Sequence, residues 1–220
     1  MFNKILIANR GEIAVRIIRA CREMGIQTVA VYSEADKDCL HTLLADEAIC
    51  IGPAVSGQSY LNMERILAAT VAMKADAIHP GFGFLSENAK FAKLCAECNI
   101  TFIGPSAEII SKMGNKSEAR KTMMEAEVPV VPGSKEPVHT PQDGLEMAKT
   151  IGFPVMIKAS SGGGGKGMRI SRSAEDFTEL FNAAQMESVK GFSDDTMYIE
   201  KYIEKPRHVE FQIMADKHGN

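Results

Sequence analysis

The chain has 220 residues, which is long enough for one large or two small domains with a buried core. With 45% hydrophobic and 24% charged residues it is an ordinary globular sequence, and its formal net charge of −3 argues against a nucleic-acid partner. Its apolar runs are too short to span a membrane and its amino terminus is unlike a signal peptide, so we expect a cytoplasmic protein without membrane contact.

The five cysteines are an odd number and lie in apolar segments, which favours reduced thiols over a disulfide framework. Cys95 and Cys98 form a C-x-x-C pair on a predicted helix, but the sequence has no second pair to complete a tetrahedral zinc site. We therefore expect both to be core thiols.

The first hundred residues alternate between apolar runs of strand length and stretches with helical spacing. Strands are predicted at 5–8, 28–32, 48–51, 77–78 and 101–103, and helices at 12–24, 40–44, 60–72 and 87–98. Strands that alternate with helices build a parallel sheet covered on both faces, so the pattern predicts a doubly wound α/β domain.

Two turns of this domain follow strands and therefore lie at the carboxyl edge of the predicted sheet, where open α/β sheets bind ligands. They are residues 9–14 and 79–84. The first turn has one glycine instead of the G-x-G-x-x-G fingerprint, so we expect no dinucleotide site there. His79 opens the second turn, and we interpret it as a loop-packing residue in preference to a general base.

Residues 106–127 are predicted to form two helical stretches that meet at Gly114 and Asn115. Lys116 begins the second stretch, where a cation opposes the helix dipole, so it is either a ligand contact or a solvated surface lysine. Residues 128–133 hold two prolines and a glycine around apolar residues, which is typical of a linker between domains.

The second half of the chain centres on a glycine-rich loop between two strands. Glycines stand at 162–165 and 167, between predicted strands at 155–157 and 168–170, with Lys158 before the loop and Lys166 inside it. Glycine lets backbone N–H groups approach an anion, so we predict a flexible flap over a polyphosphate. The loop is not a P-loop, because Ser160 and Gly167 break that motif. A disordered hairpin tip is the alternative interpretation.

The remaining predicted elements are helices at 141–152 and 173–187, strands at 197–203 and 208–215, and a hairpin turn at 216–220. The turn ends the sequence, so the last strand lacks its hairpin partner.

Six motifs occur in order and at coherent spacing from one end of the chain to the other. They are Lys4-Ile-Leu-Ile-Ala-Asn-Arg-Gly-Glu-Ile-Ala14, His79-Pro-Gly-Phe-Gly-Phe-Leu-Ser-Glu-Asn88, Met113-Gly-Asn-Lys116, Lys158-Ala-Ser-Ser-Gly-Gly-Gly-Gly-Lys-Gly-Met168, Ile199-Glu-Lys-Tyr-Ile203 and Arg207-His-Val-Glu-Phe-Gln212. Together they resemble the biotin carboxylase family, which has an ATP-grasp fold. The resemblance implies an amino-terminal α/β domain at 1–113, a helix and linker at 114–133, an ATP-grasp lid at 134–204 and the start of a truncated central domain at 205–220.

The chemistry implied by the resemblance is ATP-dependent carboxylation of biotin on a carrier protein, with bicarbonate, through carboxyphosphate. This is the first half-reaction of acetyl-CoA carboxylase in fatty acid synthesis. It implies ATP, Mg²⁺ or Mn²⁺, bicarbonate and carrier-bound biotin as cofactors and substrates. The implied partners are the biotin carboxyl carrier protein, the carboxyltransferase and a second copy of the chain in a homodimer. Arg19 and Glu23 match positions that the family uses at its dimer contact.

The resemblance also implies a set of ATP-binding residues. They are Lys116 and Lys158 at the phosphates, Gly164 and Gly165 in the flap, Glu200, Lys201, Tyr202 and Ile203 around the adenine, and His208 beside the nucleotide. Two positions depart from the family pattern, since Phe82 stands where familiar members carry Tyr and Ser161 where a glycine is usual.

The family's acidic metal ligands, bicarbonate-binding arginine and catalytic base are implied to lie beyond residue 220. We therefore assign no catalytic residue and no metal ligand within this chain, and we expect the chain alone to be inactive. The alternatives are the corresponding part of a pyruvate or propionyl-CoA carboxylase, another ATP-grasp ligase, or a non-enzymatic nucleotide-binding module that ends at Asn220. The unpaired last strand argues against such a module.

Overall fold

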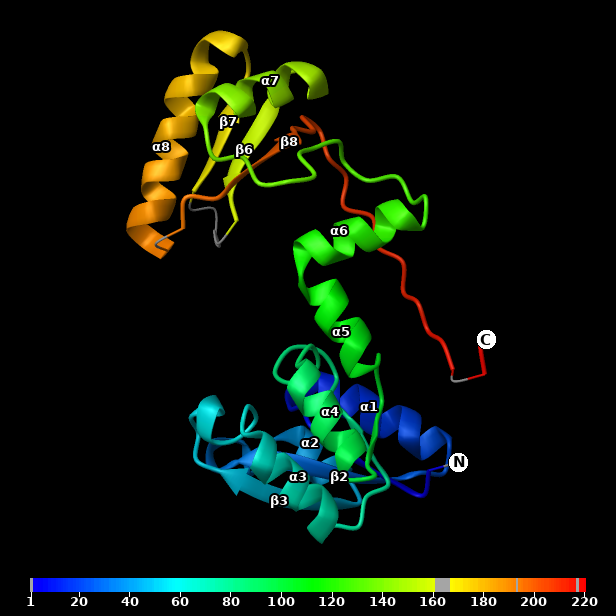
Figure 1. The fold of residues 1–220 in the computed structure, drawn as a ribbon. Helices are drawn as coiled ribbons and strands as arrows, with labels where there is room; N and C mark the ends of the chain where they lie inside the picture. The colour runs from blue at the N-terminus through cyan, green and yellow to red at the C-terminus, as the bar shows by residue number, and fades with distance from the viewer. Residues whose placement is uncertain (1, 161–166, 193, 217) are drawn as a thin grey trace. The chain divides into compact units, whose positions relative to one another are not determined.

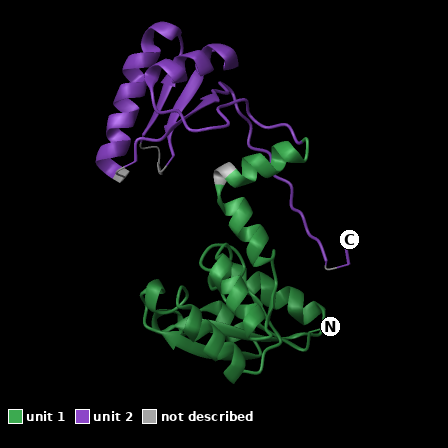
Figure 2. Ribbon diagram, viewed as in Figure 1, with its two compact units in different colours: residues 1–127 green, residues 128–220 purple. Residues whose placement is uncertain are grey.

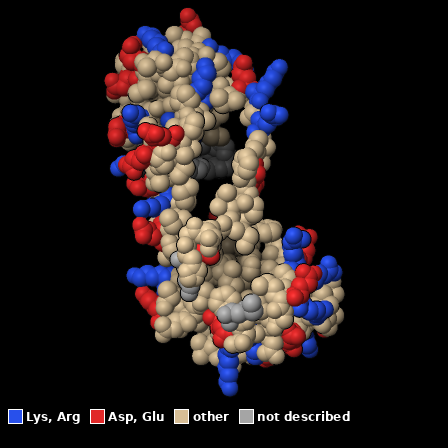
Figure 3. Space-filling view, turned by 90° about the vertical axis from the view of Figure 1, so that its right-hand side faces the viewer, with Lys and Arg blue, Asp and Glu red and all other residues tan. Residues whose placement is uncertain are grey.

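The computed structural model describes residues 2–160, 167–192, 194–216 and 218–220, except for the side chains of 116, 117 and 192. The chain forms two compact units, residues 1–127 and residues 128–220 (Figures 1 and 2). On the face shown in Figure 3, basic and acidic side chains are interspersed over each unit. Among the described residues, no helix combines the length and apolar character that a bilayer span requires.

Unit 1 contains a five-stranded parallel sheet. Its strands are β1 (Lys4–Ile7), β2 (Gln27–Ser33), β3 (Glu47–Gly52), β4 (Ala77–His79) and β5 (Thr101–Phe102), in the order β3-β2-β1-β4-β5. The chain moves from β1 outward to β2 and β3, then returns to the other side of β1 for β4 and β5. The doubly wound fold predicted from the sequence is confirmed, and its topological switch point lies between β1 and β4.

Four helices of unit 1 cover the two faces of this sheet: α1 (Gly11–Glu23) and α2 (Leu40–Leu44) on one, α3 (Met63–Ala72) and α4 (Ala89–Glu97) on the other. The 3-10 turns are η1 (Glu34–Asp36) and η2 (Ser56–Gln58). After them, α5 (Ala107–Gly114) packs against α4, and α6 (Lys116–Glu125) packs against α5 (Figure 1). Leu6 packs with residues of α3 and α4, whereas its neighbour Ile7 packs with residues of α1. Successive strand residues point to opposite faces, so a run of apolar residues serves two cores.

Two details of unit 1 differ from the sequence prediction. The helix predicted at 60–72 begins at Met63, because the side chain of Asn62 caps it by accepting the N–H of Arg65 at 3.0 Å. Tyr60 instead enters the core. Cys95 is a buried thiol as expected, but Cys98 is exposed because it is the C-cap residue at the end of α4.

Unit 2 contains a three-stranded antiparallel sheet with two helices on one face. The elements are α7 (Pro141–Ile151), β6 (Val155–Ala159), β7 (Met168–Ser171), α8 (Ala174–Phe192) and β8 (Met197–Lys201), with strand order β7-β6-β8. Alternate residues of β6 and β8 pack against both helices; this core includes Ala148, Val155, Ile157, Ala159, Phe177, Phe181, Ala184, Met197 and Ile199. The other face of the sheet carries the intervening residues.

The prediction of a strand at 208–215 is wrong, because the described residues from 202 to 216 form neither helix nor strand. Its apolar residues, such as Val209 and Phe211, are exposed. An alternating sequence forms a strand only where a neighbouring strand supplies hydrogen-bond partners and a core, and no described strand lies beside this segment. Beyond it, Asp216 Oδ1 accepts the N–H groups of His218 and Asn220 at 2.9 and 3.0 Å and closes the terminal turn.

Candidate functional site

The open face of the unit 2 sheet, which α7 and α8 do not cover, brings together an ion pair and apolar side chains. The strand registers and the alternation of burial along β6, β7 and β8 define this face. Its residues are Met156, Lys158, Met168, Ile170, Tyr198 and Glu200. The face therefore offers a positive group and apolar surface at the same place.

Lys158 and Glu200 form the polar centre of the open face. The Nζ of Lys158 lies 2.5 Å from Oε2 of Glu200, and the two side chains are 29% and 27% exposed. In the antiparallel register, Lys158 is opposite Tyr198 and Met156 is opposite Glu200, so the charged residues are diagonal neighbours on one face. The carboxylate holds the ammonium in a fixed position that remains accessible to a ligand.

Lys201 points to the other face of the sheet, since it is in register with buried Val155. Its Nζ donates to the backbone oxygens of Gly152 and Phe153 at 2.9 and 2.8 Å, so its ammonium ties the end of β8 to the turn that precedes β6. The N–H groups of Lys201 and Tyr202 donate to Pro132 and Pro154 oxygens at 2.8 and 3.0 Å. Both backbone donors are thus already used within unit 2.

The described contacts do not place the side chains of the other predicted ATP-binding residues on the open face of the unit 2 sheet. Gly164 and Gly165 lie outside the described residues, as do Ser161 and Lys166. Lys116 begins α6 in unit 1, and its side chain is not described.

The two remaining predicted positions follow β8. Ile203 is exposed just beyond that strand. His208 is exposed, and its Nε2 lies 3.1 Å from Oε2 of Glu210. Of the predicted ATP-binding side chains, the described structure therefore joins Lys158 and Glu200.

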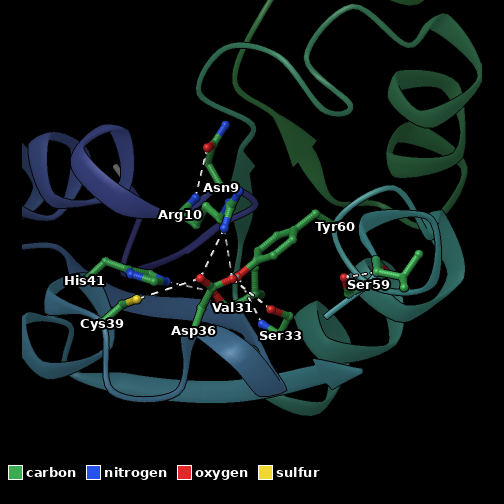
Figure 4. A network of polar contacts seen from close by, with 10 residues as sticks. Asn9, Arg10, Val31, Ser33, Asp36, Cys39, His41, Ser59 and Tyr60 are labelled. Atoms are coloured by element: carbon green, nitrogen blue, oxygen red, sulfur yellow. Dashed lines mark hydrogen bonds and ion pairs between the residues drawn. The ribbon is translucent and has the colours of Figure 1, made fainter. Parts of the chain in front are cut away.

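A buried carboxylate at the carboxyl edge of the unit 1 sheet was not found by the sequence analysis. Asp36, just after β2, accepts hydrogen bonds from the hydroxyls of Ser33 and Tyr60, both at 2.7 Å, and from Arg10 Nη1 at 3.1 Å (Figure 4). The signal that could have found it is an acidic residue directly after a strand at this edge.

Burial alone would raise the pKa of Asp36, but the two hydroxyls and the Arg10 charge outweigh it and hold that pKa below its ordinary value of 3.8. Burial and the bond to Asp36 raise the pKa of Tyr60 well above its usual range. The guanidinium of Arg10 also lies over the Tyr60 ring, 5.7 Å from its centroid. These residues form one charged and hydrogen-bonded unit that fixes the turn after β1 to the turn after β2.

His41 of α2 is fully buried next to this network (Figure 4). Its Nε2 lies 3.3 Å from the backbone oxygen of Val31, and its Nδ1 has no hydrogen-bond partner among the described residues. Burial lowers the pKa of His41; the carboxylate of Asp36 opposes this effect and the charge of Arg10 adds to it. Burial also lowers the pKa of His79, whose Nδ1 accepts the N–H of Gly81 at 3.1 Å. These two histidines are thus neutral packing residues at neutral pH.

We expect the free energy of unfolding of unit 1 to fall as the pH drops below 6.5, the ordinary histidine pKa. Both histidines take up a proton more readily in the unfolded chain than in the folded one, so acid favours unfolding and stability is complete above that pKa. Urea denaturation followed by circular dichroism at pH values from about 5 to about 8 measures this. His41→Leu should flatten the pH dependence, whereas the exposed His208→Gln in unit 2 should not. An equally steep dependence in His41→Leu would contradict the assignment.

Comparison with known families decides which kind of protein carries these features. A family model described as biotin carboxylase, N-terminal domain, matches residues 1–110, which is half of the 220-residue chain. The chain belongs to the biotin carboxylase family. A second model, described as carbamoyl-phosphate synthase L chain, ATP binding domain, matches residues 115–220. The resemblance inferred from the six motifs is therefore confirmed.

Whole-chain comparisons agree with this assignment. The biotin carboxylase of Nostoc sp. is 61% identical over 219 residues, which cover 100% of this chain and 49% of the relative. A solved biotin carboxylase–β-γ-ATP complex from Campylobacter jejuni has a TM-score of 0.79 and 50% identity, covering 94% of this chain and 46% of that chain. The chain thus spans about half the length of the curated relatives it matches.

A third relative was solved with ligands named in its description. It is the biotin carboxylase domain dimer of the Hydrogenobacter thermophilus 2-oxoglutarate carboxylase with MgADP, ADP and bicarbonate, with a TM-score of 0.75 and 49% identity, covering 93% of this chain and 45% of that chain. These matches confirm the family and the α/β ATP-grasp fold class. The individual ATP-binding residues and the domain limits at 113, 133 and 204 stay predictions.

Proposed function

We propose that the protein containing this chain carboxylates biotin on a carrier protein, using ATP and bicarbonate. The observation that carries the proposal is the 61% identity of the whole chain to a biotin carboxylase. In this reaction a bicarbonate oxygen attacks the γ-phosphorus of ATP and ADP leaves. The resulting carboxyphosphate breaks down to phosphate and CO₂, and CO₂ bonds to a ureido nitrogen of biotin as that nitrogen loses its proton.

We further propose that ATP lies on the open face of the unit 2 sheet. The accessible ammonium of Lys158 would bind phosphate oxygens and offset the negative charge that moves during phosphoryl transfer. Apolar residues of the same face, Met156 and Ile170, suit the flat surface of an adenine ring. Glu200, Tyr202, Ile203, Lys116 and His208 are proposed as the other nucleotide contacts, together with the backbone of Lys201, whose ammonium binds Gly152 and Phe153 on the other face.

Gly164 and Gly165 would close over the phosphates and exclude water, which would otherwise hydrolyse carboxyphosphate. Mg²⁺ or Mn²⁺ would supply charge compensation during the transfer. Among the described residues there is no group of three His, Cys, Asp or Glu side chains placed to hold a metal ion. Because the chain spans about half the length of its curated relatives, we propose that the metal ligands and the catalytic base belong to the rest of the protein, and that the 220-residue chain alone does not carboxylate biotin.

The proposed homodimer has a candidate surface in unit 1. The outer side of α1 and the start of α2 border a hollow of about 680 Å³ whose lining includes Arg19, Glu23 and the exposed Leu40. Interfaces between subunits commonly have an apolar centre with a polar rim, and an exposed leucine flanked by charged side chains fits that arrangement. We propose that a second copy covers this hollow, and that the carrier protein and a carboxyltransferase are the other partners, as in a cytoplasmic acetyl-CoA carboxylase that serves fatty acid synthesis.

A chimera tests the proposed function. In it, this chain replaces the matching 219 residues of the Nostoc biotin carboxylase, so that the remaining part of the family fold is present. We expect ADP release that requires both bicarbonate and free biotin. ADP release that needs neither, or that needs ammonia or an amino acid instead, would contradict the proposal and favour another ATP-grasp ligase. The same assay on the 220-residue chain tests the expected inactivity of the chain alone.

A further inference from the structure

The strand β7 lies at the edge of the unit 2 sheet. It pairs with β6, and no described strand lies on its other side. Its first residue, Met168, is opposite Lys158, so β7 forms the part of the open face beside the ammonium that is proposed to bind phosphate. An edge strand has hydrogen-bond partners on one side only, so its position depends on further contacts. These contacts come from α8, which packs on β7 (Figure 1).

Two carboxylates of α8 hold β7. At the end of the strand, Asp176 Oδ1 accepts the hydroxyl of Ser171 at 2.6 Å, and this hydrogen bond lowers the pKa of Asp176. Near the start of the strand, Oε2 of Glu187 forms an ion pair with Nη2 of Arg169 at 3.0 Å. Positions 176 and 187 are about three helical turns apart, so both carboxylates project from the same side of α8.

The guanidinium of Arg169 connects α8 to the backbone at the open face. Besides its ion pair with Glu187, it donates from Nη1 to the backbone oxygen of Met168 at 2.8 Å. Arg169 is opposite buried Ile157, so its side chain lies on the helix side of the sheet. A planar guanidinium with two fixed partners has a defined orientation. Arg169 thus joins α8 to the residue that stands opposite Lys158.

The residue that precedes β7 is packed on both sides. Gly167 has a φ of 69°, and its backbone oxygen accepts the N–H of Ala159 at 2.9 Å. A Cβ built on Gly167 would lie 2.9 Å from Cβ of Ala159 and 4.0 Å from Cβ of Ser188 on α8. The start of β7 is therefore in close contact with α8 and with the end of β6, the strand that carries Lys158.

The ion pair of Arg169 and Glu187 affects the position of β7 more than the stability of unit 2. Each side chain is 38% exposed, whereas the neighbouring positions of the same layer hold apolar residues such as Ile157. A partly exposed ion pair contributes little net free energy, because desolvation and lost side-chain entropy offset its attraction. An apolar pair would stabilise this layer as well, but it would not bind the Met168 oxygen.

We propose that Arg169 and Glu187 are positioning residues, whose ion pair holds β7 on α8 and thereby keeps the open face in the geometry that binds ATP. The inference rests on the proposed ATP site and extends it to two residues that do not touch the nucleotide. Without the pair, the start of β7 can move away from Lys158. ATP binding should therefore weaken, while biotin binding and the rate at saturating ATP stay unchanged.

A double-mutant cycle tests whether the two residues act as one unit. Arg169→Met keeps most of the apolar stem and removes the guanidinium, and Glu187→Gln keeps the size of the side chain and removes its charge. The matched control is Lys149→Met, which removes the exposed ion pair with Glu146 on α7. Arg169→Lys keeps the positive charge. The melting temperature of each variant shows whether unit 2 is folded, and Glu187→Gln carries the test if Arg169→Met is not.

The first measurement needs no nucleotide. In the 220-residue chain, hydrogen exchange of the β7 amides should be about tenfold faster in Arg169→Met and in Glu187→Gln, and no faster in the double variant than in either single one. It should stay unchanged in Lys149→Met. The second measurement is ADP release by the chimera. Each single variant and the double variant should raise the KM for ATP about fivefold and leave kcat and the KM for biotin unchanged. Arg169→Lys should keep the KM for ATP within about twofold of the wild type.

Three outcomes would overturn the proposal. They are unchanged exchange in both single variants, independent effects that multiply in the double variant, and faster exchange with an unchanged KM for ATP. A wild-type chimera without ADP release would overturn the proposed function and the link to ATP. The exchange data would then still decide whether the ion pair holds β7.

Discussion

Replacing Lys158 by methionine lowers biotin-dependent ADP release by the chimera about 100-fold or more. The ammonium of Lys158 is the cation fixed on the open face of the unit 2 sheet, and removing one group that offsets charge in a transition state costs a factor of this size. Methionine keeps the unbranched apolar stem of lysine and lacks only the terminal ammonium, so the packing around β6 changes little. The rate is measured as ADP release at saturating bicarbonate and biotin.

The matched control for this variant is Lys149→Met on α7. Lys149 also forms an ion pair, with its Nζ 2.9 Å from Oε1 of Glu146, but its side chain is 52% exposed and lies on a surface helix. An exposed pair of this kind contributes little to stability, so we expect its activity to stay near that of the wild type. Activity of Lys158→Met within about threefold of the wild type, with unit 2 folded, would contradict the proposed role.

The second large effect is on stability. Phe181→Ala should destabilise unit 2 by about 3–5 kcal/mol, because it leaves a cavity in a packed core. Phe181 is fully buried, and its ring centroid lies 5.9 Å from that of Phe177 in the layer between α8 and the sheet. Urea denaturation of the 220-residue chain, followed by hydrogen exchange of the β6 amides, measures the change within unit 2.

Met186→Ala provides the comparison on the same helix, since Met186 is 59% exposed and contributes little buried surface. We expect it to shift the free energy of unfolding by less than about 0.5 kcal/mol. If Phe181→Ala changed the free energy of unfolding as little as Met186→Ala does, the core of unit 2 would not be organised around α8 as described.

The fold of unit 1 could be predicted from the sequence because each of its strands and helices is indicated by a pattern within a short segment. Apolar runs such as 5–8, separated by helices of the right length, have few arrangements other than a doubly wound parallel sheet. The strand predicted at 208–215 shows the limit of this reasoning. Its alternating residues match a strand, but a strand forms only with a neighbour, and the sequence of one strand does not say whether a neighbour is in place.

The candidate sites were predictable only in part, for a related reason. Lys158 was found from its place beside the glycine loop, but its pairing with Glu200 depends on the register between β6 and β8. The network around Asp36 joins residues from three turns that lie far apart in the sequence. The hydrogen bonds from the Asn9 side chain to the backbone oxygens of Pro80 and Phe82 span more than 70 positions. Such contacts follow from the tertiary fold, and no spacing rule in the sequence indicates them.

The most direct test of the account is transfer of isotope label from bicarbonate to biotin by the chimera. With ATP present, we expect labelled carboxybiotin to form in a one-to-one ratio with ADP, because each carboxyphosphate delivers one carboxyl group. Omitting ATP should abolish the label, and Lys158→Met should slow its appearance about 100-fold or more. ADP release without label in biotin would contradict biotin carboxylation and leave the chain as part of an ATP-grasp enzyme that acts on another substrate.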